Sequence, residues 1–185
     1  MKLTRFHFPR SSGLIITGSA GVALLLAGTL GAQSIGFDTD ISIDDLMEAV
    51  VMPQADVIWN AVQFVSTEEG DTMIGPGTDD EWLALRHSAV TLAESANSLM
   101  VPGRPAAAPG AVANPGELAP DEIETLIDDQ RDAWNGFAQA LHGISMETVE
   151  AIDARDLDKI FLDVGGRLDE VCESCHLVFW YPEQD

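Results

Sequence analysis

Helical periodicity dominates the chain after residue 40 and constrains its fold more than any other feature. Ser42 and Asp156 can cap the first and the last of four periodic stretches. Thr78 and Glu81 have the spacing of a capping box, and Pro120 suits the first position of a helix. We therefore expect four amphipathic helices. They run over about 43–65, 79–101, 120–154 and 157–176.

Four such helices joined mostly by short loops predict an all-α protein, an antiparallel up-down-up-down four-helix bundle. No strand pattern and no internal repeat stands out. Pro53 should kink the first helix near its middle. Residues 102–119 form a Pro/Ala/Gly-rich loop without periodicity, which we expect to be mobile. In this topology the start of the first and third helices and the end of the second and fourth share one end of the molecule.

The N-terminal residues do not resemble the rest of the chain. Residues 1–10 carry three bases and no acid, and residues 13–32 carry no charge. A basic segment followed by an apolar one predicts a secretory signal peptide over 1–32, cleaved after Ala32, and a domain over 33–185. The alternative is that the segment stays as a membrane anchor, since its length can just span a bilayer. We expect a periplasmic protein of the Gram-negative type.

The charge of the chain is strongly negative. Nine bases and 31 acids give a net charge of −22, and cleavage would leave six bases and a net charge of −25. Such a surface repels nucleic acid and anionic lipid, so neither is an expected partner. It would suit a basic docking partner, although solubility or a salty medium is the simpler explanation.

The only two cysteines, Cys172 and Cys175, lie near the end of the fourth helix, with His176 directly after them. A reactive Cys-x-x-Cys pair usually sits at a helix N-terminus, whereas this pair would face the negative end of the helix dipole. A zinc site needs three or four ligands, and His87 and His142 are expected at the opposite end of the bundle. The sequence therefore argues against both a thiol oxidoreductase and a zinc site.

A disulfide and a haem attachment site remain. A Cys172–Cys175 disulfide would close a very small loop, stabilise little and leave His176 without a role. The haem alternative uses all three residues, because two thiols add to the haem vinyl groups and the next imidazole reaches the iron. Such attachment occurs outside the cytoplasm, which agrees with the export signal. We expect one covalent haem c on Cys172 and Cys175, with His176 as the proximal iron ligand.

The helical pattern and the ending Cys172-Glu173-Ser174-Cys175-His176, with Phe179 three residues on, resemble the class II cytochromes c, that is, cytochrome c prime and its low-spin relatives. The resemblance covers roughly residues 41–179. It implies a haem protein rather than an enzyme, with a redox partner that the sequence does not identify, and a homodimer through the first two helices. Low-spin members carry electrons, whereas high-spin members bind small gases such as NO or CO. Trp180 stands where many members have a basic residue.

The distal side of the iron distinguishes these two activities. Met47, Met52 and Met100 belong to the haem end of the bundle, whereas Met73 and Met146 belong to the other end. The neighbours of Met47 at helical spacing are apolar: Val50, Val51, Ile58 and Val62. Met47 is therefore the preferred distal ligand, with Met52 or Met100 as weaker candidates. An open distal site, with each Met filling the core, is the alternative.

The tryptophans, one loop arginine and a pair of glycines are less informative about function. The tryptophans Trp59, Trp82 and Trp134 are expected in the core, and Trp59 could approach the haem. Arg104 could pair with a haem propionate, although a solvated loop arginine is the simpler expectation. The pair 165–166 puts two glycines inside the fourth helix at a cost of about 1 kcal/mol each. Close approach of a neighbouring helix or subunit would explain them.

Overall fold

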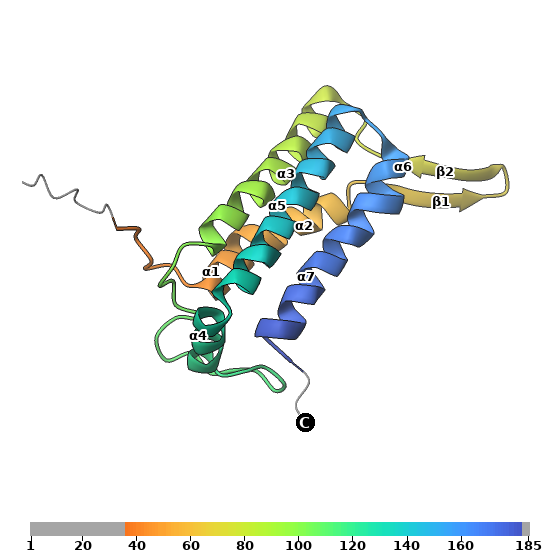
Figure 1. Cartoon of the computed structure of the whole chain (residues 1–185). Helices are drawn as coiled ribbons and strands as arrows, with labels where there is room; N and C mark the ends of the chain where they lie inside the picture. The colour runs from red at the N-terminus through yellow and green to blue at the C-terminus, as the bar shows by residue number, and fades with distance from the viewer. Residues whose placement is uncertain (1–35, 183–185) are drawn as a thin grey trace, which may run out of the picture. The chain divides into compact units, whose positions relative to one another are not determined.

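The computed structural model describes residues 36–182, so the expected signal peptide or anchor at 1–32 lies outside the described residues. The described part is mostly helical and includes one two-stranded sheet (Figure 1). The expectation of a helical protein is confirmed, and the expectation of an all-α one is corrected by the sheet. Within residues 36–182, no helix combines the length and the hydropathy that crossing a membrane requires.

The first helical rod consists of α1 (Ile43–Leu46), a π-helical turn η1 (Met47–Val51) and α2 (Met52–Trp59). Ser42 caps it as expected, because its hydroxyl accepts from the amide of Asp45 at 3.0 Å. The kink expected at Pro53 takes the form of the π turn, in which the amide of Met52 donates to the carbonyl of Met47. Proline has no amide hydrogen and its ring clashes with the carbonyl four residues back, so a widened turn relieves the clash.

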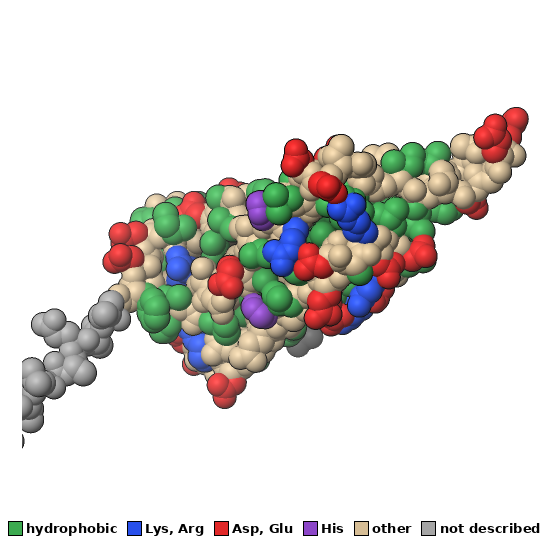
Figure 2. Space-filling model, turned by 90° about the horizontal axis from the view of Figure 1, so that it is seen from above, with side chains coloured by type: hydrophobic (Ala, Val, Ile, Leu, Met, Phe, Trp, Pro, Cys, Tyr) green, Lys and Arg blue, Asp and Glu red, His purple; other side chains and the backbone are tan. Residues whose placement is uncertain are grey.

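This rod ends at Trp59 rather than near residue 65, and a β-hairpin follows. Strands β1 (Gln63–Thr67) and β2 (Gly70–Ile74) pair antiparallel, with Gln63 opposite Ile74 and Thr67 opposite Gly70. β-branched and aromatic residues favour the extended strand, and Gly70 takes the positive φ of 128° after the turn. The hairpin projects from the helices, with acidic side chains at its tip (Figure 2).

The second helix, α3 (Asp79–Leu99), begins with the expected capping box. The Thr78 hydroxyl accepts from the Glu81 amide, and the Glu81 carboxylate accepts from the Thr78 amide at 2.9 Å. The expected third helix is two helices, α4 (Pro120–Asp129) and α5 (Arg131–Asp153), separated at Gln130. Acidic residues at 128 and 129 face the negative end of the helix dipole, which favours an end there.

The last rod consists of α6 (Leu157–Lys159), a second π turn η2 (Ile160–Val164) and α7 (Gly165–Phe179). Asp156 caps it as expected by accepting from the amide of Lys159 at 2.9 Å. Here the amide of Gly165 donates to the carbonyl of Ile160, five residues back. The first and last rods therefore each contain one π turn, a feature that often occurs where a helix serves a function.

The long helices α3 and α5 lie side by side and run antiparallel (Figure 1). Arg86 pairs with Asp153 near one end, and the Trp134 indole donates to the Leu99 carbonyl at 2.8 Å near the other. α7 lies along α5 at that second end, where Phe179 is fully buried. The start of the first rod, the end of α3, the start of α5 and the end of α7 therefore lie close together.

The Pro/Ala/Gly-rich loop contains neither helix nor strand, as expected, but it is held at both ends. The amides of Ile43 and Asp44 donate to the carbonyls of Pro105 and Ala106 at 2.8 and 3.0 Å. At the other end, the amide of Leu118 donates to the Trp180 carbonyl at 2.8 Å. These bonds tie the two ends of the loop to the first rod and to the end of α7.

Candidate functional site

The side chains of Cys172, Cys175 and His176 line one cavity between the first rod, α5 and α7. Its volume is about 40 Å³, and its walls are almost entirely apolar. The first rod contributes Met47, Val51 and Met52, α5 contributes Phe137 and Leu141, and α7 adds Val171 to the three residues above. The imidazole is the only one of these side chains that carries nitrogen, so a metal bound there would meet one nitrogen donor and several sulfur donors.

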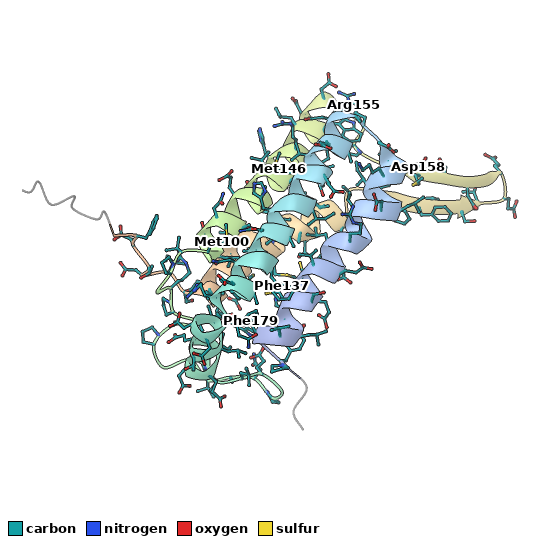
Figure 3. All side chains as sticks on the ribbon, in the orientation of Figure 1. Met100, Phe137, Met146, Arg155, Asp158 and Phe179 are labelled. Atoms are coloured by element: carbon teal, nitrogen blue, oxygen red, sulfur yellow. The ribbon has the colours of Figure 1, made fainter. Side chains whose placement is uncertain are left out.

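Helical spacing and one buried ring put the three α7 side chains on this wall. Cys172 and His176 are four residues apart on an unbroken helix, and Cys175 is three residues after Cys172, so all three share a face. One turn later, Phe179 packs edge-on against Trp134 and Phe137, with ring centroids 5.2 and 6.0 Å apart. Figure 3 shows Phe137 and Phe179 at this junction of α5 and α7. These contacts fix the rotation of α7 about its axis.

Both cysteines are free thiols and half-buried. Burial and the nearby carboxylate of Asp169 raise the pKa of Cys172 to about 11. Burial and the neighbouring Cys172 raise the pKa of Cys175 to about 12. A thiol pair used for thiol–disulfide exchange needs the opposite shift. The pair is therefore protonated at neutral pH and poorly suited to that chemistry.

The histidine is neutral and has a neighbour that the sequence did not indicate. Burial lowers the pKa of His176, although the carboxylate of Glu173 opposes the shift. The chain turns back after α7, and the Tyr181 hydroxyl reaches to 3.4 Å from Nδ1 of His176. The same hydroxyl donates to Oε2 of Glu173 at 2.7 Å. Burial, together with this carboxylate, raises the pKa of Tyr181 to about 12.

The π turn in the first rod brings two methionines to the opposite wall. Residues five apart on a regular α-helix point about 140° away from each other. The wider turn between Met47 and Met52 reduces that angle, so that both side chains line the cavity. Met47 is half-buried and packs against the core, whereas Met52 is 42% exposed. The sequence predicted that Met47 points inward, and Met47 does line the cavity. Met52 was expected to point toward mixed polar and apolar neighbours, because that prediction assumed a regular α-helix.

The other methionines within residues 36–182 lie outside this cavity lining. Met100 caps the end of α3 and packs against the core, Met73 lies in β2, and Met146 is 40% exposed on α5. Figure 3 shows Met100 at the end of α3 and Met146 further along α5, toward Arg155. Met100 therefore does not contribute to the lining of this cavity, whereas Met47 and Met52 do.

The Trp59 indole donates to the Gly165 carbonyl at 3.0 Å, a bond that does not require a glycine. Gly165 is explained by its own rod instead, because a Cβ on it would lie 3.2 Å from the carbonyl oxygen of Ile160. Gly166 has no heavy atom within 4 Å of the same position. Trp59 does not line the cysteine cavity. It borders a separate hollow of about 330 Å³ between the first and last rods, which both glycines also line.

The remaining candidates do not line the cavity. Arg104 donates to the carbonyls of Ser98 and Ile41 and does not line the cavity. His87 is exposed on α3, and His142 is half-buried on α5. Trp82 and Trp134 are buried core residues, as expected. Within residues 36–182, no three side chains from His, Cys, Asp and Glu are grouped to hold a metal ion by themselves.

The donor set fits a haem, although the cavity is small. A haem iron receives four nitrogens from its porphyrin and needs only one or two ligands from the protein, which His176 and a methionine can supply. Two thiols three residues apart meet the requirement for covalent attachment. A porphyrin is far larger than 40 Å³, so its binding requires the first rod and α7 to separate at this wall.

Comparison of the chain with protein-family models, curated proteins and solved structures gives no match.

Proposed function

We propose that this protein is an exported c-type monohaem cytochrome, built on an antiparallel up-down-up-down four-helix bundle, that transfers electrons through its haem iron. The observation that carries the proposal is the shared cavity of Cys172, Cys175 and His176 with a methionine thioether opposite. The resemblance of the C-terminal motif to that of the class II cytochromes c supports it. So do the high pKa values of both thiols, which disfavour the competing chemistry of a reactive dithiol.

Each side chain has a defined role in this proposal. The haem supplies one-electron redox chemistry when it is bound. Cys172 and Cys175 hold it covalently, and the neutral imidazole of His176 offers a lone pair to the iron. Phe137 and Leu141 close the cavity from α5 and exclude water, which keeps the environment of the iron apolar.

The distal ligand is Met47 in this proposal. Its sulfur lies on a half-buried side chain, whereas Met52 is more exposed and would have to turn inward. A high-spin protein that binds NO or CO is the second candidate, and the apolar side chains of Val51 and Leu141 in the same lining favour it. The third is a haemless helical module in which Cys172 and Cys175 form a disulfide.

A haem stain that survives denaturing electrophoresis tests the first two candidates against the third. The protein must be produced in cells that attach haem to exported proteins. We expect a stained band for the wild type and none for the variant in which both cysteines are alanine. An unstained wild-type band, with both cysteines paired, would sink both haem proposals.

The ferric absorption spectrum distinguishes electron transfer from gas binding. We expect the wild type to show the sulfur-to-iron charge-transfer band of Met ligation. The band should disappear in Met47→Ala and persist in Met52→Ala, which is a matched control from the same cavity wall. A high-spin spectrum with ready CO binding in the wild type would instead support the gas-binding candidate.

A further inference from the structure

Tyr181 lies against the imidazole that the proposed function assigns to iron. Its hydroxyl oxygen is 3.4 Å from Nδ1 of His176, and the two ring centroids are 5.7 Å apart. The residue lies beyond the end of α7, in a segment that carries no helical pattern. Nothing in the C-x-x-C-H motif requires a tyrosine there, so its position adds information that the motif does not contain.

Three hydrogen bonds hold Tyr181 and the backbone next to it in place. The Tyr181 O–H donates to Oε2 of Glu173 at 2.7 Å, a length typical of a bond to a charged acceptor. The Tyr181 amide donates to the carbonyl of His176 at 3.0 Å, which folds the backbone back over the helix end. The preceding carbonyl, on Trp180, accepts from the Leu118 amide at 2.8 Å. The ring is therefore anchored through its hydroxyl and its backbone.

The single proton of the Tyr181 phenol determines the tautomer of His176. A phenol has one proton, and the short bond to Glu173 uses it. The Tyr181 oxygen can then act toward Nδ1 of His176 only as an acceptor, so Nδ1 must carry the hydrogen. A neutral imidazole that is protonated at Nδ1 has its lone pair on Nε2, which is the atom left free to bind a metal.

We propose that Tyr181, held by Glu173, is a positioning residue that keeps His176 protonated at Nδ1 and leaves Nε2 free for the haem iron. The role toward the iron rests on the proposed function, whereas the hydrogen bonds between Tyr181, Glu173 and His176 do not depend on it. Partners of this kind fix the ring orientation of a metal-ligating histidine and raise its basicity as a donor. A more basic donor stabilises ferric over ferrous iron and lowers the midpoint potential.

The first test uses the full chain without haem. Nitrogen-15 NMR at neutral pH reports which nitrogen of His176 carries the hydrogen. We expect mainly the Nδ1–H tautomer in the wild type and at least a tenfold shift of the tautomer ratio toward Nε2–H in Tyr181→Phe, which keeps the ring and removes the hydroxyl. Glu173→Gln should shift the ratio in the same direction, because an amide can hold the phenol proton less strongly. An unchanged ratio in Tyr181→Phe would overturn the proposal.

Glu170→Gln is the matched control, because Glu170 is an exposed acid on the same helix whose side chain is outside this network. It should leave the tautomer ratio at the wild-type value. A shift as large as that of Glu173→Gln would show a general effect of charge and contradict the proposal.

The second test uses the protein with haem attached. We expect Tyr181→Phe to raise the midpoint potential by about 59 mV. For a one-electron couple, this shift corresponds to a tenfold change in the ferric-to-ferrous ratio. If no haem attaches to the wild type, the proposed function fails, whereas the tautomer ratio still decides the claim about Tyr181.

Discussion

At the scale of single residues, Phe179 decides which side of α7 faces the core. It is fully buried and packs edge-on against two aromatic rings of α5. Because Cys175 lies four residues and His176 three residues before it, the same rotation turns both toward the cavity. The site thus depends on a packing contact as well as on the reactive residues themselves.

We expect Phe179→Ala to lower the free energy of unfolding by about 3–5 kcal/mol, because it removes a buried ring and leaves a cavity. Urea denaturation followed by circular dichroism would measure the loss. Leu177→Ala is the control, since Leu177 lies on the same turn but is 46% exposed, and it should cost about 1 kcal/mol or less. Equal losses in the two variants would contradict the role given to Phe179.

The capping box of α3 makes stability depend on pH. Hydrogen bonds from Gly77 and Thr78 lower the pKa of Glu81 below its usual value of 4.5. A carboxyl with a lowered folded-state pKa stabilises the protein above its unfolded-state pKa, and this contribution is lost as the pH falls through the folded-state value. Urea denaturation at several pH values should therefore show a shallower loss of stability below about pH 4.5 for Glu81→Gln than for the wild type. Identical acid profiles would contradict this.

At the scale of elements, the sequence predicted where helices begin better than where they end. Ser42, Thr78, Pro120 and Asp156 are all helix starts, because a cap is a local interaction between neighbouring residues. The hairpin after Trp59 was missed, because residues 60–65 carry both helical periodicity and strand-forming side chains. The two π turns also escaped the pattern, since their wider spacing appears only when the backbone bonds are known.

The same limits apply to the candidate site. The motif brought Cys172, Cys175 and His176 together correctly, because all three lie on one regular helix. Met52 was placed less well, because its direction depends on the π turn over Met47–Val51. Tyr181 could not be found, because its contact with His176 depends on how the chain turns back after α7.

The two helical glycines provide a test of the second π turn. Gly165→Ala should destabilise the protein, because its Cβ would meet the Ile160 carbonyl at 3.2 Å, the acceptor of the π-turn bond. Gly166→Ala should stabilise it by about 0.5–1 kcal/mol, since the added methyl meets nothing and alanine favours the helix. Thermal or urea unfolding measures both. Stabilisation by both substitutions would contradict the close approach at Gly165.

At the scale of the whole molecule, negative charge is the dominant property. Figure 2 shows acidic side chains spread over one face and over the projecting hairpin. Several arginines are already paired with acids: Arg86, Arg131, Arg155 and Arg167. These exposed pairs contribute little, whereas the large net charge destabilises a compact state through self-repulsion.

Salt should therefore stabilise this protein. The screening length falls from about 30 Å at 0.01 M to about 3 Å at 1 M salt, which shortens the reach of the repulsion. We expect the Tm at neutral pH to rise between these salt concentrations, as measured by circular dichroism. A Tm that falls would mean that the ion pairs outweigh the self-repulsion. Sodium chloride is preferred to sulfate, because sulfate also strengthens apolar burial.

The central claim is that two thioether bonds join one haem to Cys172 and Cys175. The pyridine haemochrome spectrum of the denatured protein tests it most directly, because its absorption maximum reports how many vinyl groups are saturated. We expect two saturated vinyl groups in the wild type, one in Cys175→Ala and one in Cys172→Ala. A wild-type spectrum of unmodified haem, extractable into acidic solvent, or a protein with no haem at all, would contradict it.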